Sequence, residues 1–282
     1  MPKASELEIT RNTSFLLKSP PGFGKTIAAC SAAVFGPVFL AYFDKKAPTE
    51  VLTFYKKHRP ELLENIEWES YGSSNAHEYL NKLIGFLKDC RYSAIVTDSV
   101  TSLTSAAVNW SLSFRDVKGG AKMDKLNKEA PQMIPDWDEY KVETSLVTQA
   151  LDICKKLDVM NIWTAHPLPQ LKLSGSGTNV TSVSTTQTLV SYGNKVGAMI
   201  PAAFSEQYHF GRQGGKRVVF TDAIGDDFAK TSLPLPKMLD IEDKLFFEVW
   251  RDAVNKGLES LEGGKDVVNP FSSNEGSKKW KI

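Results

Sequence analysis

The strongest structural signal in the chain is Ser19-Pro20-Pro21-Gly22-Phe23-Gly24-Lys25-Thr26. A short apolar run, 14–17, precedes it, and a small-residue segment with helical character, 27–33, follows it. A strand, a glycine-rich turn, Lys-Thr and a helix, in that order, form the context that a phosphate-binding loop (P-loop) needs. Gly22 and Gly24 give the turn the backbone freedom to aim successive N–H groups inward.

Each part of this P-loop has an expected role toward a bound nucleotide. The helix N-terminus contributes partial positive charge, Lys25 contributes a full charge, and Thr26 offers a hydroxyl group to Mg²⁺. The usual motif has glycine where Ser19 stands, which affects the expected loop geometry more than phosphate binding itself. The residues expected to bind the nucleotide are Ser19, Pro20, Pro21, Gly22, Phe23, Gly24, Lys25, Thr26 and Ile27.

Length and composition allow one large domain, or a domain with an appendage. The chain has 282 residues and 41% hydrophobic content, which is enough to bury a full core. Its formal net charge of +1 means that any DNA-binding site would have to be local. Cys30, Cys90 and Cys154 are widely spaced among apolar residues, as reduced thiols of a cytoplasmic protein would be. No signal peptide or membrane-spanning run is recognisable, so we expect a soluble protein with no membrane partner.

Strands and helices are expected to alternate along the first half of the chain. The segments 37–44, 65–71 and 92–99 have the residue patterns of strands. Between them, 49–58 is expected to be helical, and one apolar stripe at helical spacing runs from Ala76 to Leu87. This alternation predicts a parallel, doubly wound sheet in an α/β fold.

Asp98 is the natural candidate for the acidic residue of a Walker B strand. The apolar run 94–98 would deliver its carboxylate to the C-terminal edge of the sheet, where the P-loop also lies. There the carboxylate can hold the water shell of the Mg²⁺ that Thr26 and the nucleotide bind. Apolar strands that end in Asp are common, but the P-loop upstream favours the metal-binding role. The predicted metal ligands are therefore Thr26 and Asp98.

The general base that would activate a water molecule must lie elsewhere, because Ser99 and not an acidic residue follows Asp98. Asp44 ends the strand expected at 37–44 and is the best candidate, with Glu67 and Glu69 behind it. The alternative for Asp44 is an ordinary solvated carboxylate at the end of a strand. We therefore predict Asp44 as the base and keep that alternative open.

His166 follows another apolar run, 160–165, and Pro167 then stops the strand. A lone histidine is usually structural or exposed, but the end of this strand is where a γ-phosphate sensor would have to lie. A neutral imidazole N–H could donate to a terminal phosphate that is present in ATP and absent in ADP. His166 is therefore predicted to sense the nucleotide state.

Two polar segments are candidates for contact with DNA. The stretch 113–135 carries more basic than acidic residues and is either a solvated loop or a phosphate-contacting one. Asp136 can then cap the next helix. The segment 171–192 is dominated by Ser, Thr and Gly, a composition that is expected not to order itself. It is either a flexible surface loop or a mobile loop that becomes ordered with nucleotide and DNA.

The C-terminal third is expected to add a hairpin and a helix. A short helix at 193–204 should precede a hairpin formed by 206–210 and 216–221. A further helix should cover 240–261, and 263–282 is expected to be a flexible tail. The expected organisation is one domain, 1–262, followed by the tail.

The order of elements resembles that of the RecA-like recombinase ATPases, and most closely the phage Sak-type single-strand annealing ATPases of the P-loop AAA-domain class. The resemblance spans about Phe15 to Ser232. It rests on the P-loop, the strand ending at Asp44, Asp98-Ser99-Val100-Thr101-Ser102-Leu103, and Thr164-Ala165-His166. It implies a RecA-like sheet in which the strand before His166 lies between the two Walker strands.

The same resemblance implies roles for individual residues. His166 matches a polar residue that couples the γ-phosphate to a DNA-binding loop, and 171–192 matches that loop. Asp44 matches the catalytic base by order, although glutamate is expected there. Lys230 matches a cation that reaches the ATP of a neighbouring subunit, although Ser232 stands where arginine is expected, and Arg212 is the fallback.

The sequence thus predicts a Mg²⁺-dependent ATPase that acts on single-stranded DNA in phage recombination or replication, in the host cytoplasm if it is phage-encoded. The residues expected in catalysis are Lys25, Asp44, His166 and Lys230. Expected partners are single-stranded DNA, further copies of the chain in a ring or filament, and a single-strand DNA-binding protein. The main alternative is a nucleotide-switched assembly or regulatory protein without significant hydrolysis. A P-loop kinase is weaker, because no separate acceptor site is recognisable.

Overall fold

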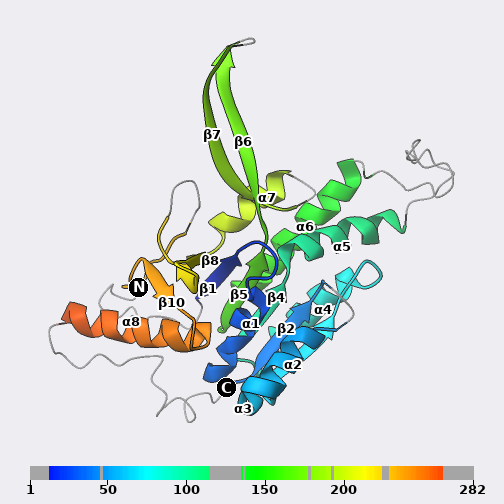
Figure 1. Ribbon diagram of the computed structural model, residues 1–282. Coiled ribbons are helices and arrows are strands. Elements are labelled where there is room, and N and C mark those ends of the chain that lie inside the picture. The colour runs from blue at the N-terminus through cyan, green and yellow to red at the C-terminus, as the bar shows by residue number, and fades with distance from the viewer. Residues whose placement is uncertain are drawn as a thin grey trace, which may run out of the picture.

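The computed structural model describes residues 13–44, 47–114, 135, 137–176, 179–191, 194–223 and 229–262. Within these ranges, one eight-stranded sheet runs through the protein (Figure 1) in the order β10-β9-β8-β1-β5-β4-β2-β3. Its strands are β1 (Ser14–Lys18), β2 (Val38–Tyr42), β3 (Ile66–Ser70), β4 (Ala94–Asp98), β5 (Met160–Ala165), β8 (Glu206–Gln213), β9 (Lys216–Phe220) and β10 (Met238–Asp240). The strands β6 (Pro167–Ser176) and β7 (Asn179–Leu189) form a separate pair.

The neighbouring strands from β8 to β3 are all parallel, which brings their carboxyl ends to one edge. The register places Lys18 beside Ala165 and Tyr42 beside Asp98. The strand before His166, β5, lies between β1 and β4, as the resemblance implied. The predicted α/β fold, a doubly wound and mainly parallel sheet of RecA-like P-loop type with a C-terminal hairpin and helix, is therefore confirmed.

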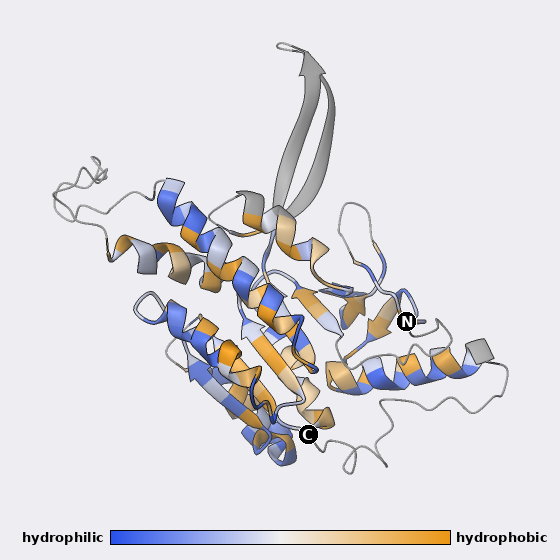
Figure 2. Cartoon of the chain, turned by 180° about the vertical axis from the view of Figure 1, so that it is seen from behind, coloured by the Kyte–Doolittle hydropathy of each residue, from blue (hydrophilic) through white to orange (hydrophobic). Residues whose placement is uncertain are grey.

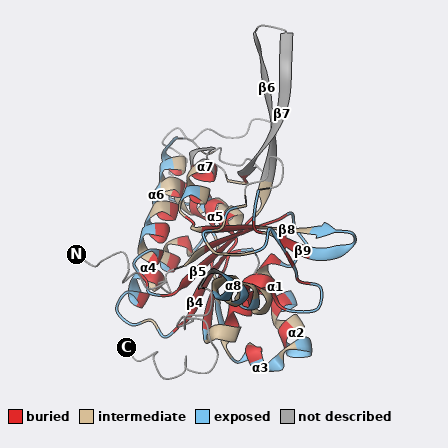
Figure 3. Cartoon of the chain, turned by 90° about the vertical axis from the view of Figure 1, so that its left-hand side faces the viewer, coloured by how far each residue is buried: buried red, intermediate tan, exposed pale blue. Residues whose placement is uncertain are grey.

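Helices cover both faces of the sheet, whose strands are buried between them (Figure 3). One face packs against α1 (Lys25–Cys30), the 3₁₀ helix Ser31–Phe35, α2 (Thr49–His58), α3 (Pro60–Leu63) and α8 (Phe246–Glu262). The other face packs against α4 (Ala76–Phe86), α5 (Val100–Leu112), α6 (Trp137–Cys154) and α7 (Asn194–Ala202). Burial on both faces explains why the central strands are apolar almost throughout.

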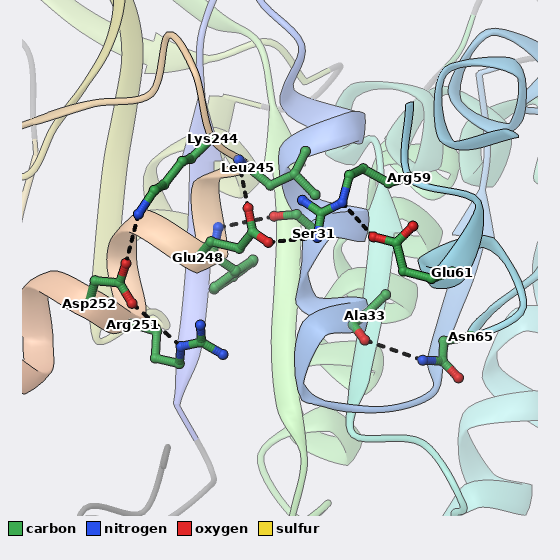
Figure 4. A network of polar contacts seen from close by, with 11 residues as sticks. Ser31, Ala33, Arg59, Glu61, Asn65, Lys244, Leu245, Glu248, Arg251 and Asp252 are labelled. Carbon is green, nitrogen blue, oxygen red and sulfur yellow. Dashed lines mark hydrogen bonds and ion pairs between the residues drawn. The ribbon is translucent and has the colours of Figure 1, made fainter. Parts of the chain in front are cut away.

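The C-terminal helix α8 is fixed to its face of the sheet by aromatic packing and an ion pair. Phe15 of β1 packs edge-on against Phe247 and Trp250, with ring centroids 5.2 and 5.3 Å apart. Figure 2 shows apolar residues on the side of α8 that meets the sheet and polar ones on its outer side. Near its first turn, Glu248 accepts a hydrogen bond from Arg59 at 2.7 Å (Figure 4). These contacts make α8 part of the hydrophobic core on the α1 face of the sheet.

The hydroxyl-rich segment after His166 is an antiparallel ribbon, so the prediction that 171–192 cannot order itself was wrong for the residues described. β6 and β7 pair from Pro167 and Leu189 to Ser176 and Asn179, and the ribbon projects from the body (Figure 1). In the sequence of β7, serines and threonines are interleaved with valines, and threonine and valine favour strands. Mutual pairing also satisfies the backbone without a large core.

Smaller features also differ from expectation. The helix expected from 240 begins at Phe246, because 238–240 form β10, which pairs with β9. Most of the charged stretch 113–135, the cap Asp136 and the tail 263–282 lie outside the described residues. No helix in the described ranges is long and apolar enough to cross a bilayer.

We expect Trp250→Ala to lower the free energy of unfolding by about 3–5 kcal/mol, because it empties a fully buried site between α8 and β1. Urea unfolding followed by circular dichroism measures the change. Trp68→Ala is the matched control, since Trp68 is 38% exposed on the edge strand β3 and its loss should cost clearly less. Equal losses in the two variants would contradict the packing of α8 on the sheet.

Candidate nucleotide-binding site

The P-loop leads from β1 into α1 and leaves open space in front of its glycines. Gly22 and Gly24 have φ angles of 83° and 80°, in the left-handed region that favours glycine. No heavy atom lies within 4 Å of the position that a Cβ would occupy at either residue, its chain neighbours aside. An open glycine turn that ends in a lysine fits a phosphate group.

The other predicted loop residues belong to the same turn. Ser19, which stands in place of the usual glycine, is fully buried, and its Oγ donates to the carbonyl oxygen of Pro20 at 2.9 Å. The loop therefore accommodates this hydroxyl group internally. Pro20 and Pro21 are exposed, whereas Phe23 and Ile27 are partly buried against the core.

Lys25 lies folded against its own loop. Its Nζ donates to the carbonyl oxygens of Ser19 and Pro20 at 2.8 and 3.0 Å. Burial lowers the pKa of Lys25 to about 8, although the charges of Asp98 and Asp44 oppose that shift. Phosphate oxygens can replace these carbonyl acceptors and would favour the charged amine.

Asp98 is the point where three segments of the chain meet. It is 2% exposed, its Oδ2 accepts a hydrogen bond from Thr26 Oγ1 at 2.8 Å, and its Oδ1 accepts one from Thr164 of β5. Burial and the nearby charge of Asp44 raise the pKa of Asp98 to about 6, against the hydrogen bonds from the two threonines. The structure thus brings the predicted metal ligands, Thr26 and Asp98, into direct contact.

Asp44 lies just beyond β2, next to Asp98. Two serines hold it: Ser99 Oγ donates to Asp44 Oδ1 at 2.9 Å, and Ser102 Oγ donates to the same oxygen. The peptide bond between Asp98 and Ser99 is cis, and Ser99 then caps α5 by accepting from the Ser102 backbone N–H. Asp44 is exposed, so its carboxylate is accessible at the sheet edge.

The fallback bases, Glu67 and Glu69, are engaged elsewhere. Glu67 accepts hydrogen bonds from Arg91 and from Tyr92, the latter at 2.8 Å. Glu69 accepts from Lys82 and from the hydroxyl of Tyr71. Both carboxylates belong to β3, the outermost strand of the described sheet. Of the candidate bases, Asp44 is the one placed beside Asp98.

His166 lies against the P-loop lysine. Its Nδ1 is 3.2 Å from Lys25 Nζ and 3.3 Å from the carbonyl oxygen of Ser19. Burial and the charge of Lys25 lower the pKa of His166, which favours the neutral ring. Its backbone oxygen accepts from the Val190 N–H at 2.9 Å, which closes the foot of the β6–β7 ribbon. The predicted sensor therefore joins the P-loop to the ribbon.

Lys230 and Arg212 lie apart from this cluster. Lys230 is exposed, and its backbone exchanges hydrogen bonds of 2.7 and 2.8 Å with Gln207 of β8. Arg212 is in the β8–β9 hairpin, where its guanidinium donates to the carbonyl oxygen of Gly215 at 3.3 Å. A cation that acts on a neighbouring copy need not be close to its own P-loop, so the role of Lys230 stays a prediction.

The donor set fits a hard cation that keeps part of its water shell. Thr26 and Asp98 offer a hydroxyl group and a carboxylate, oxygen ligands of the kind that Mg²⁺ prefers. In the described part of the chain, no group of three or more His, Cys, Asp or Glu side chains could hold a metal. A metal here would be held by Thr26, Asp98 and nucleotide phosphates, with Lys25 as the phosphate-binding cation.

Sequence reasoning missed the hydroxyl groups that support the carboxylates. Thr164, Ser99 and Ser102 were not expected to contact Asp98 or Asp44, yet each donates to one of them. The spacing of Ser99 and Ser102 could have indicated a helix cap. Nothing in that spacing indicates a bond to a residue on another strand.

Comparison with known proteins gives a distant structural likeness. The sequence matches no protein-family model and no curated protein. One similar solved structure is the KaiC-like protein PH0186 from the hyperthermophilic archaeon Pyrococcus horikoshii OT3, with a TM-score of 0.40 and 14% sequence identity. The match covers 74% of this chain and 78% of that one. A likeness this distant bears on neither activity nor partners.

Nucleotide binding should take up a proton at Lys25 in mildly alkaline solution. Because the pKa of Lys25 is about 8, part of the free protein lacks this proton there. A bound phosphate favours the charged amine and raises its pKa again. We therefore expect uptake of roughly half a proton per MgATP at about pH 8, and much less at about pH 7.

Isothermal titration calorimetry in two buffers with different heats of ionisation measures this uptake. Lys25→Arg is the control, because a guanidinium group stays protonated throughout this pH range. Any residual binding by that variant should show no uptake from this side chain. Wild-type binding heats that do not depend on the buffer would contradict the expectation.

Proposed function

We propose that this protein is a Mg²⁺-dependent ATPase that acts on single-stranded DNA in phage recombination or replication. The proposal follows the resemblance of its sequence to the Sak-type annealing ATPases. The observation that carries the ATPase proposal is the 2.8 Å hydrogen bond from Thr26 to Asp98. It joins the P-loop hydroxyl and a buried strand-end carboxylate at one point. Lys25, Asp44 and His166 surround that point.

The residues of this edge can divide the chemistry of hydrolysis among them. Lys25 would transfer its hydrogen bonds from the loop carbonyls to the β- and γ-phosphates. Asp44, oriented by Ser99 and Ser102, would accept the proton of the attacking water. Mg²⁺, when bound, spreads the charge that develops on the phosphates. His166 would donate to the γ-phosphate from its neutral ring.

The proposed DNA partner draws support from the position of the ribbon. β6 begins at the residue after His166, and the His166–Val190 hydrogen bond closes its foot. Loss of the γ-phosphate would therefore change the contacts of a residue that anchors a projecting element. An element of this kind could report the nucleotide state to a bound strand.

Assembly is part of the proposal. In a ring or filament, Lys230 of one copy would neutralise charge on the nucleotide of the next. Its exposure and the two backbone bonds to Gln207 suit a cation presented on a fixed segment. A single-strand DNA-binding protein is a further proposed partner, and the host cytoplasm is the proposed place of action.

Phosphate release measured with and without single-stranded DNA tests this function. We expect Mg²⁺-dependent hydrolysis that DNA stimulates and that Lys25→Ala lowers by at least about 100-fold. Lys82→Ala is the matched control, because Lys82 pairs with Glu69 on the outer strand. Absence of both ATP binding and hydrolysis would disprove the proposal, whereas hydrolysis indifferent to DNA would leave only the ATPase.

Asp44→Asn separates hydrolysis from a nucleotide-driven assembly switch. We expect kcat to fall by about 10²–10⁴-fold with little change in ATP affinity, because a general base acts in the chemical step. Asp152→Asn, an exposed carboxylate of α6, should leave kcat unchanged. The competing function predicts ATP-dependent oligomers in both wild type and Asp44→Asn, with negligible phosphate release in either. Light scattering during size-exclusion chromatography detects such oligomers.

A further inference from the structure

A cleft of about 720 Å³ opens beside Asp44, on the side of α5. Its walls come from the end of β2, the turn before α4, one side of α5 and the segment after β7. Polar side chains from all four parts line it, among them Asp44, Ser73, Ser102, Ser105, Asn109 and Ser191. A cleft of this size is in the range of small-molecule sites.

The lining chemistry selects a neutral ligand that forms hydrogen bonds. Among the described residues that line the cleft, Asp44 is the one charged side chain, and no lysine or arginine contributes. A phosphate group would therefore meet a carboxylate without a cation. Hydroxyl groups and the amide of Asn109 offer both donors and acceptors, which an apolar ligand would leave unsatisfied.

Two aromatic residues lie further along the chain from the cleft, one in the last turn of α5 and one just after it. Asn109 is followed by Trp110, whose ring stacks on His77 with centroids 5.1 Å apart. Phe114 meets Trp110 edge-on at 5.3 Å and is 73% exposed. Neither ring lines the cleft, but an exposed ring a short way along the chain from Asn109 could stack on a further base of a bound strand.

The walls of the cleft are also tied to the nucleotide site. Ser102 lines the cleft and donates to Asp44. Val190 also lines the cleft, and its N–H donates to the backbone oxygen of His166. A ligand that contacts both Ser102 and Val190 would therefore act on the hydrogen bonds that hold Asp44 and His166. These two residues lie beside Lys25 and the predicted metal ligands.

We infer that this cleft binds a nucleobase and couples its presence to the P-loop through Ser102 and Val190. The planar, uncharged base fits the lining, and an asparagine amide can pair with a base edge through two hydrogen bonds. Either a free nucleoside or an unpaired strand could present the base. The coupling rests on the proposed ATPase, whereas the binding does not.

Fluorescence anisotropy without nucleotide tests the binding. The probes are a labelled oligothymidylate and an abasic strand of the same length. We expect wild type to prefer the oligothymidylate by about tenfold and Asn109→Ala to lose most of that preference. The matched control is Gln149→Ala, which removes an exposed helix amide on α6, outside the cleft. Unlabelled thymidine that displaces the strand would identify a site for free nucleosides, and its failure would identify the strand as the source.

Two results would overturn the inference: equal affinity of wild type for both strands, or an undiminished preference in Asn109→Ala. The coupling is tested separately by phosphate release. The oligothymidylate concentration needed for half-maximal stimulation should rise by the same factor in Asn109→Ala, while hydrolysis without DNA stays unchanged. If wild type shows the base preference but no hydrolysis, the proposed ATPase fails and the base site stands.

Discussion

The rest of the site depends on the hydrogen bonds that hold the buried carboxylate of Asp98. A charge that is 2% exposed is costly unless donors surround it. Its donors come from two other segments, Thr26 after the P-loop turn and Thr164 of β5. They reach it only because β1, β5 and β4 are parallel neighbours. The order of strands is therefore the condition for holding this charge.

Much of this arrangement could be predicted because the ends of buried strands are recognisable in a sequence. Apolar runs that end at Asp44 and Asp98, and a third that ends just before His166, belong to an alternating pattern whose parallel strands meet at one edge. The contact between Thr26 and Asp98 follows from that pattern and the P-loop. The chemical roles of Asp44, His166 and Lys230 stay predictions, because position alone does not establish a reaction.

What could not be predicted depends on contacts between distant parts of the chain. Ser99 and Ser102 have the spacing of a helix cap, but their bonds to Asp44 exist only once β2 and β4 are side by side. Composition misled at 171–192, because the rule that polar segments stay disordered assumes that order requires a core. β10 displaced the expected start of α8 through its pairing with β9.

The length of the ribbon determines how far its end moves when its base rotates. Its strands are ten and eleven residues long, so each extends about 33 Å from the body at the usual rise per residue. Both ends of its foot are tied at one place, the bond between the Val190 N–H and the His166 oxygen. The near end of the ribbon is thus joined to His166, which contacts the P-loop lysine, whereas the far end lies away from the body. A rotation of about 4° at this point would move the far end of the ribbon by about 2 Å.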